Sequence, residues 1–186
     1  MCDMKFQENI QEQFIKAGWY ENRDVSSLYE NSNILRYENF PSLLKEFLSE
    51  YGNLEVEYCK SRQSQVRNLL QISLDYAGFE DDEDYDENFD ISGILFYPFA
   101  YFFPDCYMVA CDKNGKVYLL GEEIFLISKD LKSGIQNLLL DDYSQGYLAF
   151  DPKKNYRFLR KNIRDGISKL KYIYHINTYN IFKNLC

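Results

Sequence analysis

The chain has 186 residues, a formal net charge of −8 and an aromatic content of 17%, which suit one folded domain with an appendage rather than a disordered chain. The negative charge argues against nucleic acid as the principal ligand, because binding phosphates requires positive charge. The first residues lack the basic-then-apolar order of a secretory signal, and no run approaches about 18 apolar residues. We therefore expect a cytoplasmic protein that does not enter a membrane.

The first predicted helix has apolar side chains at helical spacing, at Phe6, Ile10, Phe14 and Ala17. Gly18 follows, where a residue in the left-handed conformation would end the helix. We expect Trp19 to plug the core and Arg23 to bond nearby carbonyls or Asp24, although a recognition site formed by Trp19 and Arg23 is an alternative. Asp24 is expected to cap a short helix that reaches Glu30.

Pro41 suits the first turn of the next helix, which Gly52 closes. Its apolar stripe consists of Leu43, Leu44, Phe47, Leu48 and Tyr51. Alternating residues then predict strands at 54–58 and 70–74. Residues 93–99 predict another strand, which we expect the proline at position 98 to end.

Residues 106–111 and 116–120 are apolar runs that flank Asn114-Gly115, a strong signal for a β-hairpin. A last strand is expected at 124–127. A closing helix that ends near Asp141 is indicated by Leu131, Ile135, Leu138 and Leu139. Helices, then consecutive strands, then a helix predict an α+β fold with a largely antiparallel sheet.

Charge separates the body of the chain from its end. Residues 1–150 contain 12 basic and 27 acidic side chains, whereas residues 151–186 contain nine basic and two acidic ones. We therefore expect a domain at 1–150 and a basic C-terminal extension at 151–186. Apolar residues at helical spacing predict that the extension is a helix packed on the acidic domain. Binding of the extension to a membrane or to nucleic acid is the alternative.

The run from Glu80 to Asp90 has eight carboxylates in eleven residues. It does not fit an EF-hand, since Glu87 and Gly93 occupy the positions that need glycine and a bidentate carboxylate. The run is either a solvated loop or a docking surface for a basic partner. In the second case Tyr85 and Phe89 would be anchors. The candidate partner-binding residues are then Asp81, Asp82, Asp84, Tyr85, Asp86 and Phe89.

No motif predicts catalysis, a metal site or a cofactor. The five cysteines include no C-x-x-C pair, and none has a nucleophile signature. His175 is the only histidine, and no phosphate-binding glycine loop, H-E-x-x-H or G-x-S-x-G is present. We expect reduced thiols, no catalytic residue, no metal and no cofactor.

The order of these features resembles the SUKH superfamily of small bacterial immunity proteins, and within it the third subgroup, SUKH-3. The resemblance begins with the helix followed by Ala17-Gly18-Trp19 and Arg23. Residues 95–100 resemble the proline-containing strand of the family, and residues 108–118 resemble its D-x-x-G-x-V-Y hairpin. The resemblance covers residues 6–140, apart from the acidic insertion at 80–90, and leaves out the extension at 141–186.

The resemblance implies helices around a central mixed or antiparallel sheet, no enzymatic activity, and binding to a cognate toxin of a polymorphic or contact-dependent system. Members of the family are paired with nuclease, deaminase and other toxins. The acidic body favours a toxin with a basic, nucleic-acid-binding surface. The alternative is a general protein-interaction or regulatory module of the superfamily that has no toxin partner.

Overall fold

The computed structural model describes residues 5–30, 40–58, 68–74, 90–91, 94–103, 107–121, 124–140, 142, 147–150 and 159–161. The helices in these residues are α1 (Glu8–Lys16), the 3-10 helix η1 (Ser26–Leu28), α2 (Ser42–Tyr51) and α4 (Leu131–Leu140). The strands are β1 (Leu54–Tyr58), β2 (Asn68–Ile72), β3 (Asp90–Ile91), β4 (Ile94–Phe103), β5 (Tyr107–Asp112), β6 (Val117–Leu120), β7 (Ile124–Ser128), β8 (Tyr147–Phe150) and β9 (Leu159–Lys161). None of the described helices is long and apolar enough to cross a membrane.

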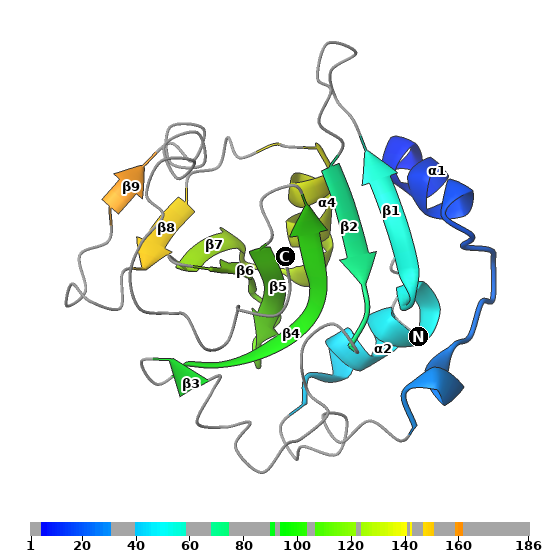
Figure 1. Ribbon diagram of the computed structural model, residues 1–186, viewed down its shortest axis with the longest axis horizontal. Helices are drawn as coiled ribbons and strands as arrows, with labels where there is room; N and C mark the ends of the chain where they lie inside the picture. Colours follow the sequence, from blue (N-terminus) through cyan, green and yellow to red (C-terminus); the bar gives the residue numbers. More distant parts are fainter. Residues whose placement is uncertain are drawn as a thin grey trace.

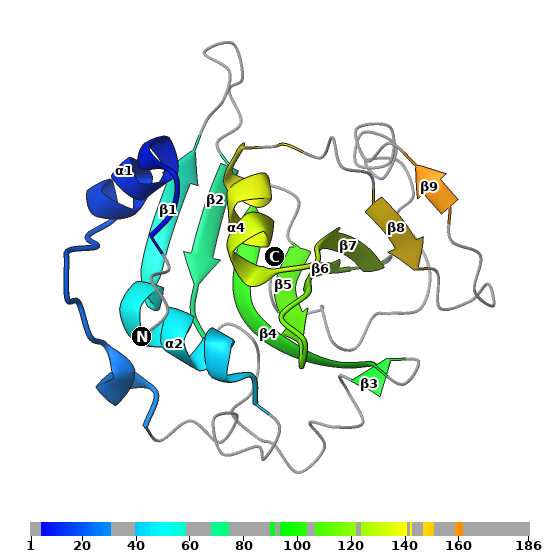
Figure 2. The same ribbon diagram turned by 180° about the vertical axis from the view of Figure 1, so that it is seen from behind.

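The strands form one antiparallel sheet in the order β1-β2-β4-β5-β6-β7-β8-β9, with β3 beside β4. Helices α2 and α4 lie on the same face of this sheet, and α1 lies beside its β1 edge (Figures 1 and 2). The architecture is the α+β fold with an antiparallel sheet that the sequence predicts.

Apolar and polar residues alternate along β1 and β2, so this part of the sheet has an apolar and a polar face. Leu54 and Val56 of β1 pair with Ile72 and Leu70 of β2, and all four side chains are buried. Between them, the exposed Glu55 pairs with Gln71, whose side-chain amide donates to the Glu55 carboxylate at 2.9 Å. The apolar face is therefore turned toward the helices, and the polar face is partly open to solvent.

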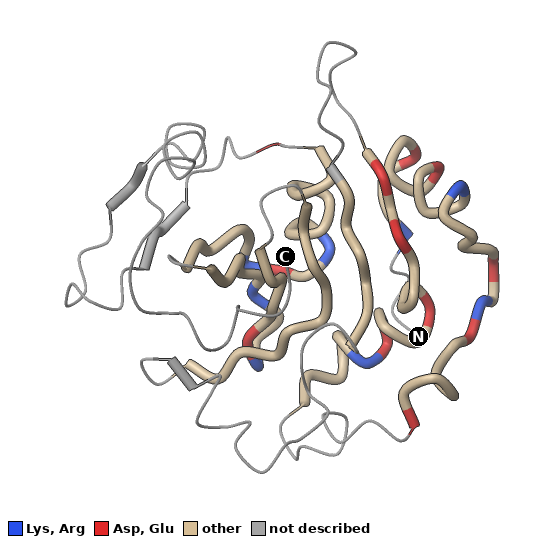
Figure 3. The backbone as a smooth tube through the Cα atoms, viewed as in Figure 1, with Lys and Arg blue, Asp and Glu red and all other residues tan. Residues whose placement is uncertain are grey.

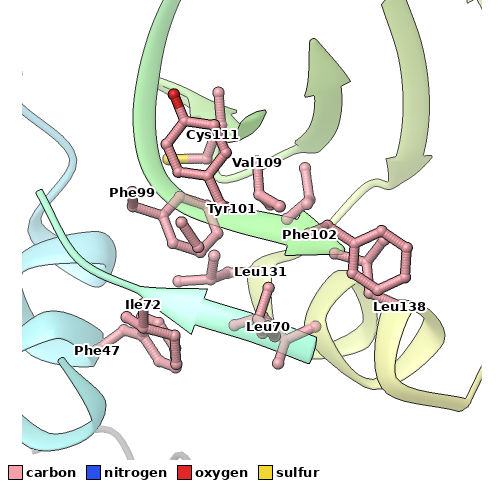
Figure 4. Packing of buried hydrophobic residues seen from close by; sticks show 14 of the residues in the cluster. Phe47, Leu70, Ile72, Phe99, Tyr101, Phe102, Val109, Cys111, Leu131 and Leu138 are labelled. Atoms are coloured by element: carbon pink, nitrogen blue, oxygen red, sulfur yellow. The ribbon is translucent and has the colours of Figure 1, made fainter. Parts of the chain in front are cut away.

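Aromatic and aliphatic side chains from the helices and the sheet form one core. Phe47 of α2 lies beside Ile72 of β2, and Leu138 of α4 lies beside Phe102 of β4 (Figure 4). Helix α4 approaches β6 closely because Gly134 has no side chain. A Cβ atom at Gly134 would lie only 2.6 Å from Cβ of Val117.

The prediction that Pro98 ends its strand is wrong. Strand β4 continues to Phe103, with an irregular register between Pro98 and Ala100. Pro98 itself pairs with Ala110 of β5 at this irregularity, and a β-bulge is one of the places in a sheet where proline is found.

The predicted hairpin is confirmed, and its turn is organised by Asp112. Strands β5 and β6 pair from Met108↔Leu120 to Cys111↔Val117. The Asp112 carboxylate accepts hydrogen bonds from the backbone nitrogens of Asn114 and Lys116 at 2.8 and 3.0 Å. The turn also needs the positive φ of Gly115, 77°, a conformation that glycine adopts without a steric penalty.

The structure also corrects two predictions of helix. The segment that starts at Asp24 contains only a single 3-10 turn, in which the Asp24 carboxylate accepts a hydrogen bond from the Ser26 backbone nitrogen at 2.9 Å. In the C-terminal extension, the described residues Leu159–Lys161 form strand β9 rather than helix, because their backbones pair with β8. The other residues of the extension, 151–158 and 162–186, lie outside the described residues.

Candidate docking surface

The six residues that the sequence suggests for partner binding, Asp81, Asp82, Asp84, Tyr85, Asp86 and Phe89, all lie outside the described residues. Of the acidic run, the structure describes only Asp90, which pairs with Leu95 in the short ladder between β3 and β4. His175 also lies outside the described residues. The docking role of the acidic run thus stays a prediction.

The glycine and tryptophan that follow α1 form a Schellman motif. The backbone nitrogen of Gly18 donates to the Ile15 carbonyl at 3.0 Å, and that of Trp19 donates to the Phe14 carbonyl at 2.8 Å. Gly18 has a φ of 104°, as expected for the residue that ends the helix. This geometry directs Trp19 into the core, where it is 7% exposed and stacks on Tyr51 with ring centroids 5.7 Å apart.

Polar contacts hold the segment after α1 against the C-terminal end of α2. The indole nitrogen of Trp19 donates to Oε1 of Glu50 at 3.2 Å, and Nη1 of Arg23 donates to the backbone carbonyl of Glu50 at 2.6 Å. The backbone nitrogen of Val25 donates to the Ser49 carbonyl at 2.8 Å. A cation beside the last carbonyls of a helix is favourable, so Trp19 and Arg23 have a structural role, as the sequence predicts.

Helix α1 and the segment after it present large apolar side chains to solvent. Tyr20 is 62% exposed, Leu28 59% and Ile15 53%. Among the described residues, the only other large apolar side chain that is exposed is Ile94, at 37%. Tyr20, Leu28 and Ile15 all fall within residues 15–28, so this stretch of the chain is a candidate interaction site.

Acidic side chains outnumber basic ones in the same part of the molecule. We define the acidic edge as residues 8–30 and 54–58, which comprise α1, the segment after it, η1 and β1. It has two basic side chains, Lys16 and Arg23, against seven acidic ones: Glu8, Glu12, Glu21, Asp24, Glu30, Glu55 and Glu57. These acidic positions lie on one side of the molecule (Figure 3). The edge therefore has a net negative charge, which is complementary to a basic surface.

Helix α1 covers the outer side of strand β1. In the amide orientation that satisfies both of its partners, Gln13 donates to the Glu57 carbonyl at 3.2 Å and accepts from Nζ of Lys16 at 3.1 Å. Asn9 donates from Nδ2 to the Tyr58 hydroxyl at 3.4 Å. Helix α1 thus protects the sheet edge from strand addition, and a partner at this edge would meet side chains.

The acidic and nucleophilic groups of the β5–β6 hairpin are buried and serve the fold. The Tyr118 hydroxyl donates to Oδ2 of Asp112 at 3.3 Å. Burial, and next the negative charge of Asp112, raise the pKa of Cys111 and of Tyr118 well above their ordinary values. A thiol held protonated in this way is a poor nucleophile. Within the described part of the chain, no group of three or more His, Cys, Asp or Glu side chains could hold a metal ion.

The sequence predictions did not include Ile15, Tyr20 or Leu28 as surface anchors. One signal was present, because Ile15 lies off the stripe that Ile10 and Phe14 form on α1 and so falls on the outward face of the helix. The exposure of Tyr20 and Leu28 depends on the turn after Gly18 and on η1, which the pattern of the sequence does not define.

Comparison with known proteins gives one match. The family model described as SUKH-3 immunity protein matches residues 6–141, which include the acidic edge, the core strands and α4, and end before β8. Neither a curated protein nor a solved structure was found to match the chain.

Proposed function

Since this chain belongs to the SUKH-3 immunity protein family, we propose that it binds and neutralises a cognate bacterial toxin of a polymorphic or contact-dependent system. The toxin would be a nuclease or another nucleic-acid-acting protein with a basic surface. The proposal rests on the family match over residues 6–141. The negative charge of the domain supports the choice of a toxin with a basic surface.

The excess of acidic over basic side chains in residues 1–150 favours a basic partner. Opposite charges steer two proteins toward each other and raise the association rate. Rapid association is what an immunity protein needs when a toxin reaches the cytoplasm. A surface that binds nucleic acid must itself be basic, so the acidic domain would compete with the substrate for the same region of the toxin.

Neutralisation by binding is stoichiometric and needs no chemistry from this chain. One bound molecule would occupy or distort the active region of one toxin molecule. The acidic run at 80–90 is one proposed contact, in which Asp81, Asp82, Asp84 and Asp86 steer association while Tyr85 and Phe89 fill pockets of the toxin. The basic extension, 151–186, is proposed to pack on the acidic domain through opposite charge.

Co-expression tests the proposal. The C-terminal domain of the protein encoded beside the gene of this chain is expressed as the candidate toxin in a sensitive bacterial strain, with and without the full chain. The proposal expects growth to be restored, and the two proteins to co-purify in equal amounts. If the toxin stops growth whether or not this chain is present, the toxin partner is wrong, and the general interaction module of the superfamily becomes the better description.

A further inference from the structure

We propose that the acidic edge is the surface on which this protein docks the basic face of its toxin, with Ile15, Tyr20 and Leu28 as the anchors. The proposal rests on the function proposed above and adds to it a surface other than the acidic run at 80–90.

Exposure is the first observation. Three of the four large apolar side chains that are exposed in the described residues fall between positions 15 and 28. Tyr20 has the largest exposed fraction, 62%, although its neighbour Trp19 is buried at 7%. Tyrosine is among the residues that most often dominate interface energetics, because it has a large apolar ring, a polar tip and few rotatable bonds.

Rigidity is the second observation. The segment that contains Tyr20 is fixed at both ends: the Schellman motif fixes its start, and the Val25–Ser49 backbone bond fixes its end to α2. Between them, Arg23 is bonded to Glu50, and the backbone nitrogen of Arg23 donates to the Tyr20 carbonyl at 3.1 Å. Anchors held in place before binding lose little conformational entropy when the partner arrives.

Charge selects the partner. Glu12 lies three residues before Ile15 on the outward face of α1, Glu21 follows Tyr20 directly, and Asp24 lies between Tyr20 and Leu28. The pKa of Asp24 is lowered, mainly by the hydrogen bond from the Ser26 backbone nitrogen, so the carboxylate stays charged at neutral pH. Glu21 of this edge forms an ion pair with Lys5 at 3.4 Å, and both side chains are largely exposed. Such a pair is weak, and a basic partner can displace it.

The position of the edge favours the toxin over the chain's own extension as the occupant. The edge lies in the part of the chain that matches the immunity protein family, residues 6–141, whereas the basic extension lies beyond the match. A surface within the family domain is the one expected to perform the function that gives the family its description. The experiment below distinguishes the toxin from two other possible occupants of the acidic edge, which are the chain's own extension and a second copy of the chain.

The experiment compares full-length variants in binding kinetics against the neighbouring toxin domain, made catalytically inactive for expression. Tyr20→Ala and Leu28→Ala should each weaken binding by about tenfold or more, mainly through faster dissociation. Glu12→Gln combined with Glu21→Gln should instead slow association, and the effect should shrink at high salt. Ile94→Ala is the matched control, because it removes an exposed aliphatic side chain outside the edge, and it should bind like the wild type.

Thermal unfolding shows that each variant is folded, and light scattering gives its oligomeric state. If the wild type binds and both anchor variants bind equally well, the inference is overturned while the proposed function stands. If the anchor variants alter only the oligomeric state, the occupant is a second copy and the inference is also overturned. Tighter toxin binding by the anchor variants would mean that the chain's own extension occupies the edge, which overturns the inference too. Absence of binding by the wild type overturns the proposed function, and the inference falls with it.

Discussion

A hydrogen bond 3.2 Å long joins the indole nitrogen of Trp19, in the segment after α1, to the carboxylate of Glu50 in α2. The bond satisfies the polar atom of a buried tryptophan whose ring lies on Tyr51. The backbone carbonyl of the same Glu50 accepts a hydrogen bond from Arg23. The Trp and Arg of the family-like motif therefore meet at one residue of α2, and their joint role is to fix the segment that displays Tyr20.

Replacing Trp19 by alanine should destabilise the protein strongly. The change removes a buried ring and leaves a cavity beside Tyr51, so the free energy of unfolding should fall by about 3–5 kcal/mol. Tyr20→Ala is the control, since the exposed neighbour should alter stability by no more than about 0.5 kcal/mol. Urea denaturation of the two variants measures both values. Similar losses for Trp19→Ala and Tyr20→Ala would mean that the tryptophan does not plug the core.

Replacing Gly134 by alanine should destabilise the contact between α4 and β6. Alanine favours helix over glycine by about 1 kcal/mol, yet the new methyl group would overlap Val117, and overpacking of a core costs about 1–3 kcal/mol. We therefore expect a net loss of stability. Combining Gly134→Ala with Val117→Ala should cost less than the sum of the two single changes, because the second change makes room for the first. Additive losses in denaturant titrations would contradict the close approach.

The protein should lose stability at alkaline pH through Cys111 and Tyr118. Burial raises the pKa of both groups, whose ordinary values are 9.0 and 10.0. Above pH 9 the unfolded chain releases protons that the folded chain retains, so the free energy of unfolding is intact below pH 9 and falls as the pH rises. Denaturant titrations at pH 8 and pH 10 measure the change. A third titration above pH 10 measures the further loss, which Tyr118→Phe should reduce. Equal free energies of unfolding for the wild type at pH 8 and pH 10 would contradict the prediction that the folded chain keeps the Cys111 thiol and the Tyr118 phenol protonated.

Much of the fold could be predicted because short-range signals determine it. Gly18 needs a positive φ at a helix end, Asn114-Gly115 needs a tight turn, and each gave an element boundary that the structure confirms. The periodic residues of α2 and α4 predicted their buried faces for the same reason. These signals depend on a residue's own conformational preference or on its immediate neighbours.

The errors arose where distant pairing decides the structure. Pro98 is a local signal for the end of a strand, but β4 continues through it because Pro98 pairs with Ala110 of β5 beside a register irregularity. Leu159–Lys161 belong to a segment with helical spacing, yet pairing with β8 makes them a strand. Tyr20 and Leu28 could not be predicted as exposed, since the contacts of Trp19, Arg23 and Val25 with α2 decide which side chains of that segment reach solvent.

The acidic run should affect the rate of association with the toxin if it is a docking surface. Replacing Asp81, Asp82, Asp84 and Asp86 with asparagine removes four charges, so association at low salt should slow and dissociation should change little. Replacing Tyr85 and Phe89 with alanine should instead speed dissociation, because anchors act by filling pockets. The readout is binding kinetics at low and high salt. Association of the asparagine variant at the wild-type rate, even at low salt, would leave the run as a solvated loop.

Titration of toxin activity with this protein tests the central claim most directly. The purified toxin domain encoded beside the gene is assayed on a nucleic acid substrate while the full-length protein is added in increasing amounts. We expect the activity to fall in proportion to the added protein and to vanish at one equivalent, because neutralisation occurs by stoichiometric binding. Full toxin activity in the presence of excess, folded protein would contradict the claim that this chain is an immunity protein for that toxin.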